Sequence, residues 1–544
     1  MLTPMPAAPW LRYAAILLLG GIAHYFALQA DFYLDDDMHI VSEPAVYEGA
    51  WMGKTWRWIP YLIWSGVYQL FGTASPAYHA MTLAVHLTIG CLLYPIGRQL
   101  LTAAKVFAKD ADRDFASWVG ALIFICHPLT TEPVHYARCL MIDCVALFTV
   151  LTVWRALVFA QKPGFRSAGW LALVMILGVC SKQPGVGHIT ISAAIVILAF
   201  ADWRAWRKNL KPETPRQTAL LVIAGLGLLA MLIPWILRGS KSLGHPLLFE
   251  HALTQSRVFW GYVQRIILPT NLSPDHYIPM TMSWRDTGAI VSSIALAVLV
   301  GFAVWLFRSR RWKLGGVLLC LALAQILIRF GYVIGELMVE YRLYPAMPWI
   351  ALGAGCGLVA LTRWKQRAGL AAMALVIGSF TMLSIQRSHL WTDVQLLAGD
   401  AVEQYPNNLR AHGSVQLDAV LAKDFERVLE LEKAGDEAFL GTLRFNKENR
   451  NRAFELSRFH HWYSLYLGYN GVARGQVVSL ESGAIYTKEK LDEMISKYPH
   501  RYLEKSGDLE NPLVMFSQIF EGQLCESTAM AYEIEQKKPQ LSSR

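Results

Sequence analysis

The stretch that decides the fold is Leu11-Arg-Tyr-Ala-Ala-Ile-Leu-Leu-Leu-Gly-Gly-Ile-Ala-His-Tyr-Phe-Ala-Leu-Gln-Ala30, followed at once by Asp31-Phe-Tyr-Leu-Asp-Asp-Asp-Met-His39. The first part is mostly apolar and has the length that an α-helix needs to cross a bilayer. It lacks an Ala-x-Ala cleavage pattern, so we interpret it as a retained membrane span. The second part places three consecutive carboxylates at its end. Because like charges raise the pKa of at least one carboxyl, this cluster favours proton transfer or cation binding, and we predict an active site there.

The composition indicates that the rest of the chain follows the same pattern. Its 544 residues are 54% hydrophobic and 17% charged, with a mean hydropathy of +0.31, which is too apolar for soluble domains of ordinary size. Apolar windows long enough to cross a membrane recur at 11–30, 77–97, 117–134, 140–160, 217–237, 287–307, 314–333, 343–361 and 369–385. Two shorter windows, 168–181 and 185–201, flank Ser181-Lys-Gln-Pro-Gly185. We therefore predict an all-α polytopic membrane protein with about 11 transmembrane helices.

The basic residues predict how these spans are oriented. They gather in short loops at 98–113, 162–166, 204–216, 308–313 and 363–367, which alternation of the spans places on the side of the N-terminus. The positive-inside rule makes that side cytoplasmic. An odd number of spans then sends the acidic cluster and everything after about residue 386 to the far side. These loops, together with membrane lipids, explain the net charge of +9, so we do not expect a nucleic-acid partner.

Two domains are predicted from this layout. A transmembrane domain, 1–385, contains the first extracytoplasmic loop, 31–76, whose tryptophans and tyrosines suit a helix lying along the membrane interface. An extracytoplasmic helical domain, 386–544, has no apolar run of membrane length. Its first part, 391–423, resembles one tetratricopeptide-like hairpin without a second copy. The cysteine spacing contains neither a disulfide framework nor a metal–thiolate pattern.

Asp35, Asp36 and Asp37 suit a general base that accepts a proton from an attacking hydroxyl. A divalent cation, Mg²⁺ or Mn²⁺, is the other use of such a cluster, and a turn in which an aspartate caps free N–H groups is the structural alternative. The position between a membrane span and an aromatic segment favours the functional reading.

A second charged group lies in His127-Pro-Leu-Thr-Thr-Glu-Pro-Val-His-Tyr-Ala-Arg138. Its histidines and Glu132 match no standard zinc spacing, so we interpret Arg138 as a partner for phosphate or carboxylate. The alternative is a structural pair of Arg138 with Glu132 or Asp143. His79, one of two histidines on a single face of the second span, is either a packing residue or a substrate contact.

Two further cations complete a predicted phosphate site. Lys182 lies at the break between the two short spans, where unwound backbone can hold an anion, and Arg342 lies two residues after Glu340. With Arg138 they would surround a lipid-linked phosphate and offset the charge that develops on a departing phosphate. Each of them, taken singly, is equally explained as an interfacial anchor.

Several short motifs follow one another in a consistent order over about residues 10–425. They are Asp35-Asp-Asp-Met-His-Ile-Val-Ser-Glu-Pro-Ala-Val46, Trp56-Arg57, Phe71-Gly72, Tyr78-His79, His86, His127-Pro128, Thr131-Glu132, Arg138, Ser181-Lys182, Glu340, Arg342, Tyr344-Pro345, Trp391 and Pro406-Asn-Asn408. Their order resembles that of the transmembrane, tetratricopeptide-containing O-mannosyltransferases, which are GT-C glycosyltransferases. The chain resembles a short, bacterial type of member, because the long repeat array is missing.

The resemblance implies a GT-C-like bundle and a polyprenyl-phosphate sugar as donor. It implies Asp35 as catalytic base with Asp36 supporting it, donor phosphate binding by Arg138, Lys182 and Arg342, and substrate or supporting contacts from the residues Arg57, His79, His127, Glu132 and Glu340. The acceptor would be a protein, such as a pilin, or an envelope glycan or lipid. It also implies a bacterial inner membrane, with the active site and C-terminal domain in the periplasm. A lipid-linked sugar transporter and a noncatalytic scaffold remain as alternatives from other classes.

Overall fold

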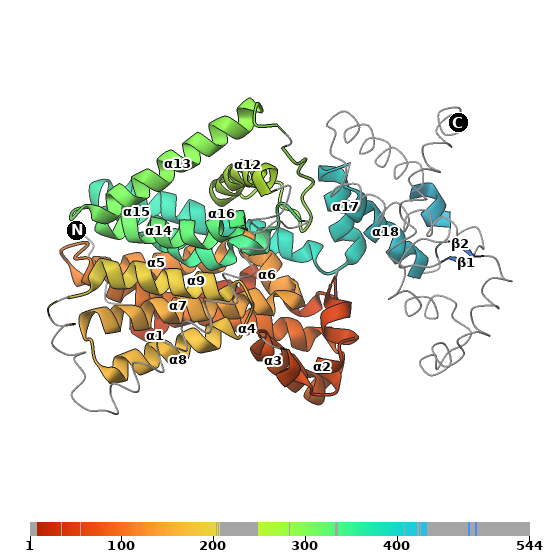
Figure 1. Cartoon of the computed structure of the whole chain (residues 1–544), viewed down its shortest axis with the longest axis horizontal. Helices are drawn as coiled ribbons and strands as arrows, with labels where there is room; N and C mark the ends of the chain where they lie inside the picture. The colour runs from red at the N-terminus through yellow and green to blue at the C-terminus, as the bar shows by residue number, and fades with distance from the viewer. Residues whose placement is uncertain are drawn as a thin grey trace. The chain divides into compact units, whose positions relative to one another are not determined.

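The computed structural model of the chain describes residues 8–202 except 34 and 55, then 204, 206, 248–281, 283–331, 336–406, 408–421, 424, 426–431, 477–478 and 485–486. The chain divides into two compact units (Figure 1). The first unit comprises Met1–Leu272 and Ser283–Asp393, and the second comprises Ser273–Met282 and Val394–Arg544.

The first unit is built of helices that run largely alongside one another (Figure 1). Its longer helices are α1 (Pro9–Ala23), α3 (Trp58–Phe71), α4 (Ser75–Ala103), α5 (Asp110–Cys126), α7 (Leu140–Gln161), α8 (Phe165–Val179), α9 (Gly185–Phe200), α12 (Leu248–Ile267), α13 (Thr287–Arg308), α14 (Lys313–Leu327), α15 (Met347–Trp364) and α16 (Gln366–Leu390). Short helical turns connect them: η1 (Tyr25–Gln29), η2 (Asp37–Val41), α2 (Pro44–Tyr47), η3 (Trp51–Gly53), η4 (Pro128–Thr130), α6 (Thr131–His135), η5 (Ala137–Cys139), η6 (Ile328–Gly331) and η7 (Glu340–Ala346).

The predicted all-α membrane class is confirmed. Among the described residues, six helical stretches are long and apolar enough to cross a membrane: Ser75–Ala103, Ala137–Gln161, Thr287–Arg308, Lys313–Gly331, Glu340–Trp364 and Gln366–Leu390. Three shorter apolar helices, α1, α8 and α9, accompany them. The chain is thus an integral membrane protein. The predicted span at 217–237 lies outside the described residues, so the predicted number of about 11 remains approximate.

One predicted span ends earlier than expected. The predicted window is 117–134, yet α5 ends at Cys126 and the chain turns through η4 and α6. His127 is extended, with φ −73° and ψ 128°, because a residue that precedes proline is driven away from the helical region. This break places residues 127–139 in a folded connection between two helices, and the candidate site is built on that connection.

Close packing of α5 against α15 fixes the position of a second connection. A Cβ atom at Gly355 would lie 2.6 Å from the backbone oxygen of Ala116 and from the backbone nitrogen of Gly120, so only glycine fits there. Small residues of this kind let two membrane helices approach closely. Because α15 follows η7 directly, the same packing brings η7 against η4 and α6.

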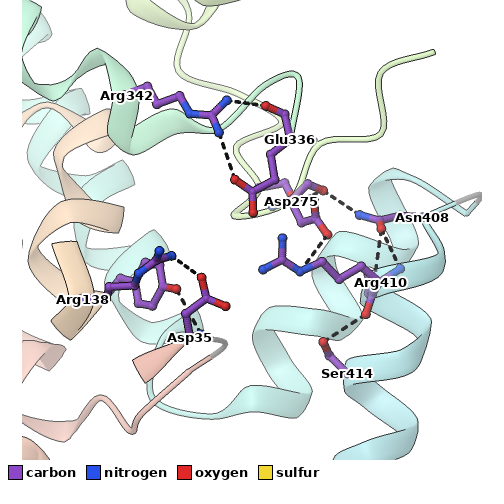
Figure 2. Close-up of polar contacts among 11 residues, drawn as sticks. Asp35, Arg138, Asp275, Glu336, Arg342, Asn408, Arg410 and Ser414 are labelled. Atoms are coloured by element: carbon purple, nitrogen blue, oxygen red, sulfur yellow. Dashed lines mark hydrogen bonds and ion pairs between the residues drawn. The ribbon is translucent and has the colours of Figure 1, made fainter. Parts of the chain in front are cut away.

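The second unit contains two packed helices, α17 (Val394–Gln404) and α18 (Leu409–Leu421), and an antiparallel pair of short strands, β1 (Val477–Val478) and β2 (Ile485–Tyr486). Asn408 caps α18, since its side-chain oxygen accepts hydrogen bonds from the N–H groups of Arg410 and Ala411. Asn408 also donates to the backbone oxygen of Asp275 over 2.7 Å, which ties the segment Ser273–Met282 to this hairpin (Figure 2). The likeness to a tetratricopeptide unit stays a prediction.

Candidate active site

The first loop presents Asp35 as a partly exposed carboxylate. Its side chain is 31% exposed and forms an ion pair with the guanidinium of Arg138, which Figure 2 shows facing it. The backbone N–H of Asp35 donates a hydrogen bond of 3.2 Å to the hydroxyl of Tyr136, and the Tyr136 ring stacks on Trp391 at 6.1 Å. Asp35 is therefore held against the connection between α5 and α7, although 103 residues separate it from Arg138.

Asp36 has different surroundings, although it is the next residue. Its side chain is fully buried, and its two oxygens accept hydrogen bonds from the backbone N–H groups of Arg138 (2.6 Å) and Tyr33 (3.0 Å). Burial raises the pKa of Asp36 from 3.8 to about 8. The expected raised carboxyl pKa is thus found at Asp36, and its main cause is burial, whereas the sequence had pointed to repulsion among the acids. Asp36 fastens the first loop to the start of α7.

The groups around Asp35 and Asp36 do not form a ligand set for a divalent cation. Both oxygens of Asp36 are engaged by N–H groups, and the cation beside Asp35 is the guanidinium of Arg138. Within the described part of the chain, no group of three His, Cys, Asp or Glu side chains has the geometry of a metal site. The side chain of Asp37 lies outside the described residues. We assign no chemical step to a metal.

Two of the three cations predicted to bind phosphate, Lys182 and Arg342, lie beside one aromatic ring, that of Tyr341 in η7. The Nζ atom of Lys182 lies 5.0 Å from the ring centre and the Cζ atom of Arg342 lies 5.9 Å from it. Arg138 interacts electrostatically with both Tyr341 and Lys182. Burial and the positive charges of Arg329 and Arg138 lower the pKa of Lys182 to about 7. The arrangement concentrates positively charged groups, of which Arg138 is paired with Asp35 and Arg342 with Glu336.

Arg342 is paired with Glu336 and not with Glu340, the acid two residues before it. Its guanidinium donates to the backbone oxygen and to a carboxylate oxygen of Glu336, the latter at 2.9 Å (Figure 2). Glu340 is fully buried and faces Arg387 of α16, with 3.8 Å between Oε2 and Nη2. The alternative pairs of Arg138 with Glu132 or Asp143 are replaced by the pair with Asp35.

Glu132 lies beneath the turn that carries Tyr341. It is 1% exposed, and its Oε2 atom accepts a hydrogen bond of 2.8 Å from the backbone N–H of Tyr341. Burial and the nearby charge of Glu340 raise the pKa of Glu132 well above its ordinary value. Glu132 thus contacts the backbone of the cationic turn.

The remaining predicted residues are Arg57, His79 and His127, and each has different surroundings. Arg57 hydrogen-bonds to Tyr61 of α3, and its charge acts on Lys182, so it belongs to the cationic side of the site. His79 is fully buried in α4, with its ring 6.3 Å from that of Phe32, which supports the first loop by packing. His127 lines an apolar cavity of about 620 Å³ between α5, α12, α15 and α16, where it bonds to the backbone oxygen of Ile266 at 3.0 Å.

Sequence reasoning missed three residues that the structure brings to this site. Tyr341 had no motif to mark it, although it stands between Glu340 and Arg342. Arg329 was hidden inside the apolar window 314–333, and Arg387 follows the last predicted span. The detectable signal was an arginine at the end of an apolar run, because an ionisable group at that depth is paired or functional.

No protein-family model matches the sequence, and no curated protein matches it. Among solved structures, the crystal structure of ArnT from Cupriavidus metallidurans bound to undecaprenyl phosphate is similar. The likeness covers 97% of this chain and 88% of that chain, with 14% sequence identity and a TM-score of 0.39.

Proposed function

We propose that the chain is an inverting membrane glycosyltransferase of the GT-C type, which moves one sugar from a polyprenyl-phosphate donor to a hydroxyl acceptor. One observation carries this proposal: the partly exposed carboxylate of Asp35 touches Arg138, whose charge in turn acts on Lys182 and Tyr341. A base and an anion site therefore adjoin each other in an integral membrane protein, as transfer from a lipid-linked phosphate requires.

The reaction uses these groups on opposite sides of the sugar. The acceptor oxygen forms a bond to the anomeric carbon while the bond from that carbon to the phosphate oxygen breaks. The acceptor proton passes to a carboxylate oxygen of Asp35, and the bonding electron pair leaves with the phosphate. Arg138, Lys182 and Arg342 offset the charge that develops on the phosphate. No protonated acid is needed, because a phosphate is already a good leaving group, and attack opposite to it inverts the anomeric centre.

The ion pair between Asp35 and Arg138 suggests the order in which the two substrates bind. A donor phosphate competes with Asp35 for the guanidinium of Arg138, since a bidentate contact with phosphate is available to it. Release of Asp35 from the pair leaves its carboxylate able to accept the proton of a hydroxyl. Donor binding would then precede productive binding of the acceptor.

The sidedness of the site is inferred from the basic loops. They place the connections 31–76, 127–139 and 180–184 on the side opposite the cytoplasm. For a bacterial inner membrane this is the periplasm, where the second unit would also lie. We take a protein hydroxyl as the acceptor, as in O-glycosylation of a pilin, with an envelope glycan or lipid as the alternative; the family resemblance does not choose between them.

The test is a transfer assay in membranes that contain or lack the chain, with a panel of radiolabelled polyprenyl-phosphate sugars. The proposal expects label in a new covalent product only when the chain is present. Label that crosses the bilayer while still attached to its lipid would indicate a transporter. Absence of transfer with the whole panel, together with partner capture that depends on the second unit, would support a scaffold and overturn the proposal.

A further inference from the structure

Arg342 and Tyr341 lie on η7, so the backbone position of η7 decides where this cation and this ring lie relative to Lys182. That position depends on a buried contact outside the turn itself. Glu132, from α6, accepts the hydrogen bond of the Tyr341 N–H group at 2.8 Å. Arg342, the next residue along, carries one of the cations, and the Tyr341 ring faces Lys182 as well.

Glu132 cannot act on a substrate directly, because its side chain is only 1% exposed. Its influence passes through the backbone of Tyr341. In this respect it differs from Asp35, which has 31% of its side chain open to solvent. A residue that acts in this manner sets the affinity for the phosphate without touching it.

The charges beneath the turn determine whether Glu132 is protonated. Glu132 and Glu340 are both buried and interact with each other, and Arg387 is the cation whose charge acts most strongly on Glu132. The guanidinium of Arg387 also donates a hydrogen bond of 2.6 Å to the backbone oxygen of Leu272. The charge of Arg342 also acts on Glu132, but its guanidinium is paired with Glu336, so Glu132 and Glu340 depend mainly on Arg387. This favours retention of a proton on one of the two buried acids, since like charges at short range cannot both ionise cheaply.

We propose that Glu132 is a positioning residue for the donor phosphate: as a neutral acid it accepts the Tyr341 N–H bond and thereby holds η7 where the Tyr341 ring and Arg342 lie beside Lys182. This inference rests on the proposed function. It goes beyond that function because it makes the affinity for the donor depend on Glu132, a side chain that does not touch the phosphate. A glutamine at position 132 keeps an oxygen acceptor of the same length and should replace the neutral acid. A leucine has similar size but leaves the Tyr341 N–H group buried without that acceptor.

The experiment measures equilibrium binding of undecaprenyl phosphate to the purified full chain in detergent. The proteins compared are the wild type, Glu132→Gln, Glu132→Leu and the control Ser384→Ala. Ser384 is buried and donates a hydrogen bond of 2.8 Å to the backbone oxygen of Cys126, so the control removes a buried tertiary hydrogen bond elsewhere in the same unit. Thermal unfolding of each protein is recorded alongside, and with an active donor the KM for donor is measured separately from kcat.

We expect Glu132→Leu to weaken binding at least ~10-fold, because the Tyr341 N–H loses its acceptor. Glu132→Gln and Ser384→Ala should bind within ~2-fold of wild type, since both keep the acceptor for Tyr341. In transfer, Glu132→Leu should raise the KM for donor more than it lowers kcat.

Three results would overturn the inference. Equal binding by a folded Glu132→Leu protein removes the positioning function while leaving the proposed enzyme intact. Tenfold weaker binding by Glu132→Gln shows that an ionised carboxylate is required, and this variant decides the matter if Glu132→Leu does not fold. Absence of binding by the wild type refutes the polyprenyl-phosphate site itself, and with it both proposals.

Discussion

Replacement of Asp36 by asparagine tests whether this buried carboxyl, which anchors the first loop, is protonated in the folded protein. The measured quantity is the pH dependence of the free energy of unfolding. Asp36 is fully buried, and burial raises its pKa from 3.8 to about 8. Between these two values the folded protein keeps a proton that the unfolded chain has released. Unfolding then releases a proton, so the free energy of unfolding falls as the pH rises from about 4 to about 8.

The size of the effect follows from the linkage relation. Each pH unit inside this window lowers the contribution of Asp36 to the free energy of unfolding by about 1.4 kcal/mol. From pH 5.5 to 7.5 the wild type should therefore lose about 3 kcal/mol relative to Asp36→Asn, whose amide does not titrate. Below the window the two proteins should differ by a constant amount, set by the hydrogen bonds to Tyr33 and Arg138.

The assay is unfolding of the purified chain with increasing SDS in a mild detergent, repeated across the pH range. Asp31→Asn is the matched control, because it removes an exposed carboxylate of the same loop. A wild-type minus Asp36→Asn difference that does not change with pH would show that Asp36 holds no proton. A difference that grows with pH would show an ionised Asp36 stabilised by its N–H donors and by Arg138.

Three further predictions concern the cation group and the helix packing that positions it. Arg138→Leu should weaken undecaprenyl phosphate binding at least ~10-fold in an equilibrium binding assay, because a charge-assisted contact is lost; unchanged affinity would remove Arg138 from the phosphate site. Lys182, with a pKa of about 7, is protonated at pH 6 and neutral at pH 9, so wild-type affinity should fall over this range more than that of Lys182→Arg; parallel pH profiles would contradict this. Gly355→Ala should lower the free energy of unfolding by ~1–3 kcal/mol, since its Cβ would lie 2.6 Å from the backbone of α5, whereas Gly357→Ala meets nothing within 4 Å; equal unfolding curves for the two variants would refute the packing argument.

The helices were predictable from the sequence because apolar length is a local property. The start of α4 near residue 77 and the break at Ser181 follow from hydropathy and from proline or glycine. The end of α5 at Cys126 was misplaced for a physical reason. The first part of the connection after it is also buried, so the apolar window runs past the end of the helix, although Pro128 and Pro133 were local signs of the break.

The site was predictable in its charges and unpredictable in its pairing. The sequence marks four charged residues as candidates, because a charge at the end of an apolar run is costly unless it is paired or functional. They are Asp35, Arg138, Lys182 and Arg342. Which of them meet depends on tertiary packing, as the ion pair between Asp35 and Arg138 shows. The contrast between a buried Asp36 and a partly exposed Asp35 arises in an irregular turn, where no periodicity assigns side chains to a face.

Tyr341 shows a different limit of sequence reasoning. An aromatic residue in a membrane protein is ordinarily read as packing or as an interfacial anchor. Its position beside Lys182 and Arg342 depends on η7 being held against α6 by Glu132. That contact joins residues 209 positions apart in the chain, and no pattern in one sequence encodes it.

The most direct test of the central claim is sugar transfer by the Asp35→Asn protein. Membranes containing the wild type, Asp35→Asn or the loop control Asp31→Asn are given radiolabelled polyprenyl-phosphate sugars, and covalent label in endogenous acceptors is counted. Matched yield and monodispersity ensure that equal amounts of folded protein are compared. We predict transfer by the wild type and by Asp31→Asn, with a loss of at least ~100-fold in Asp35→Asn because the general base is removed. Equal transfer by Asp35→Asn and the wild type would contradict the assignment of Asp35 as the base.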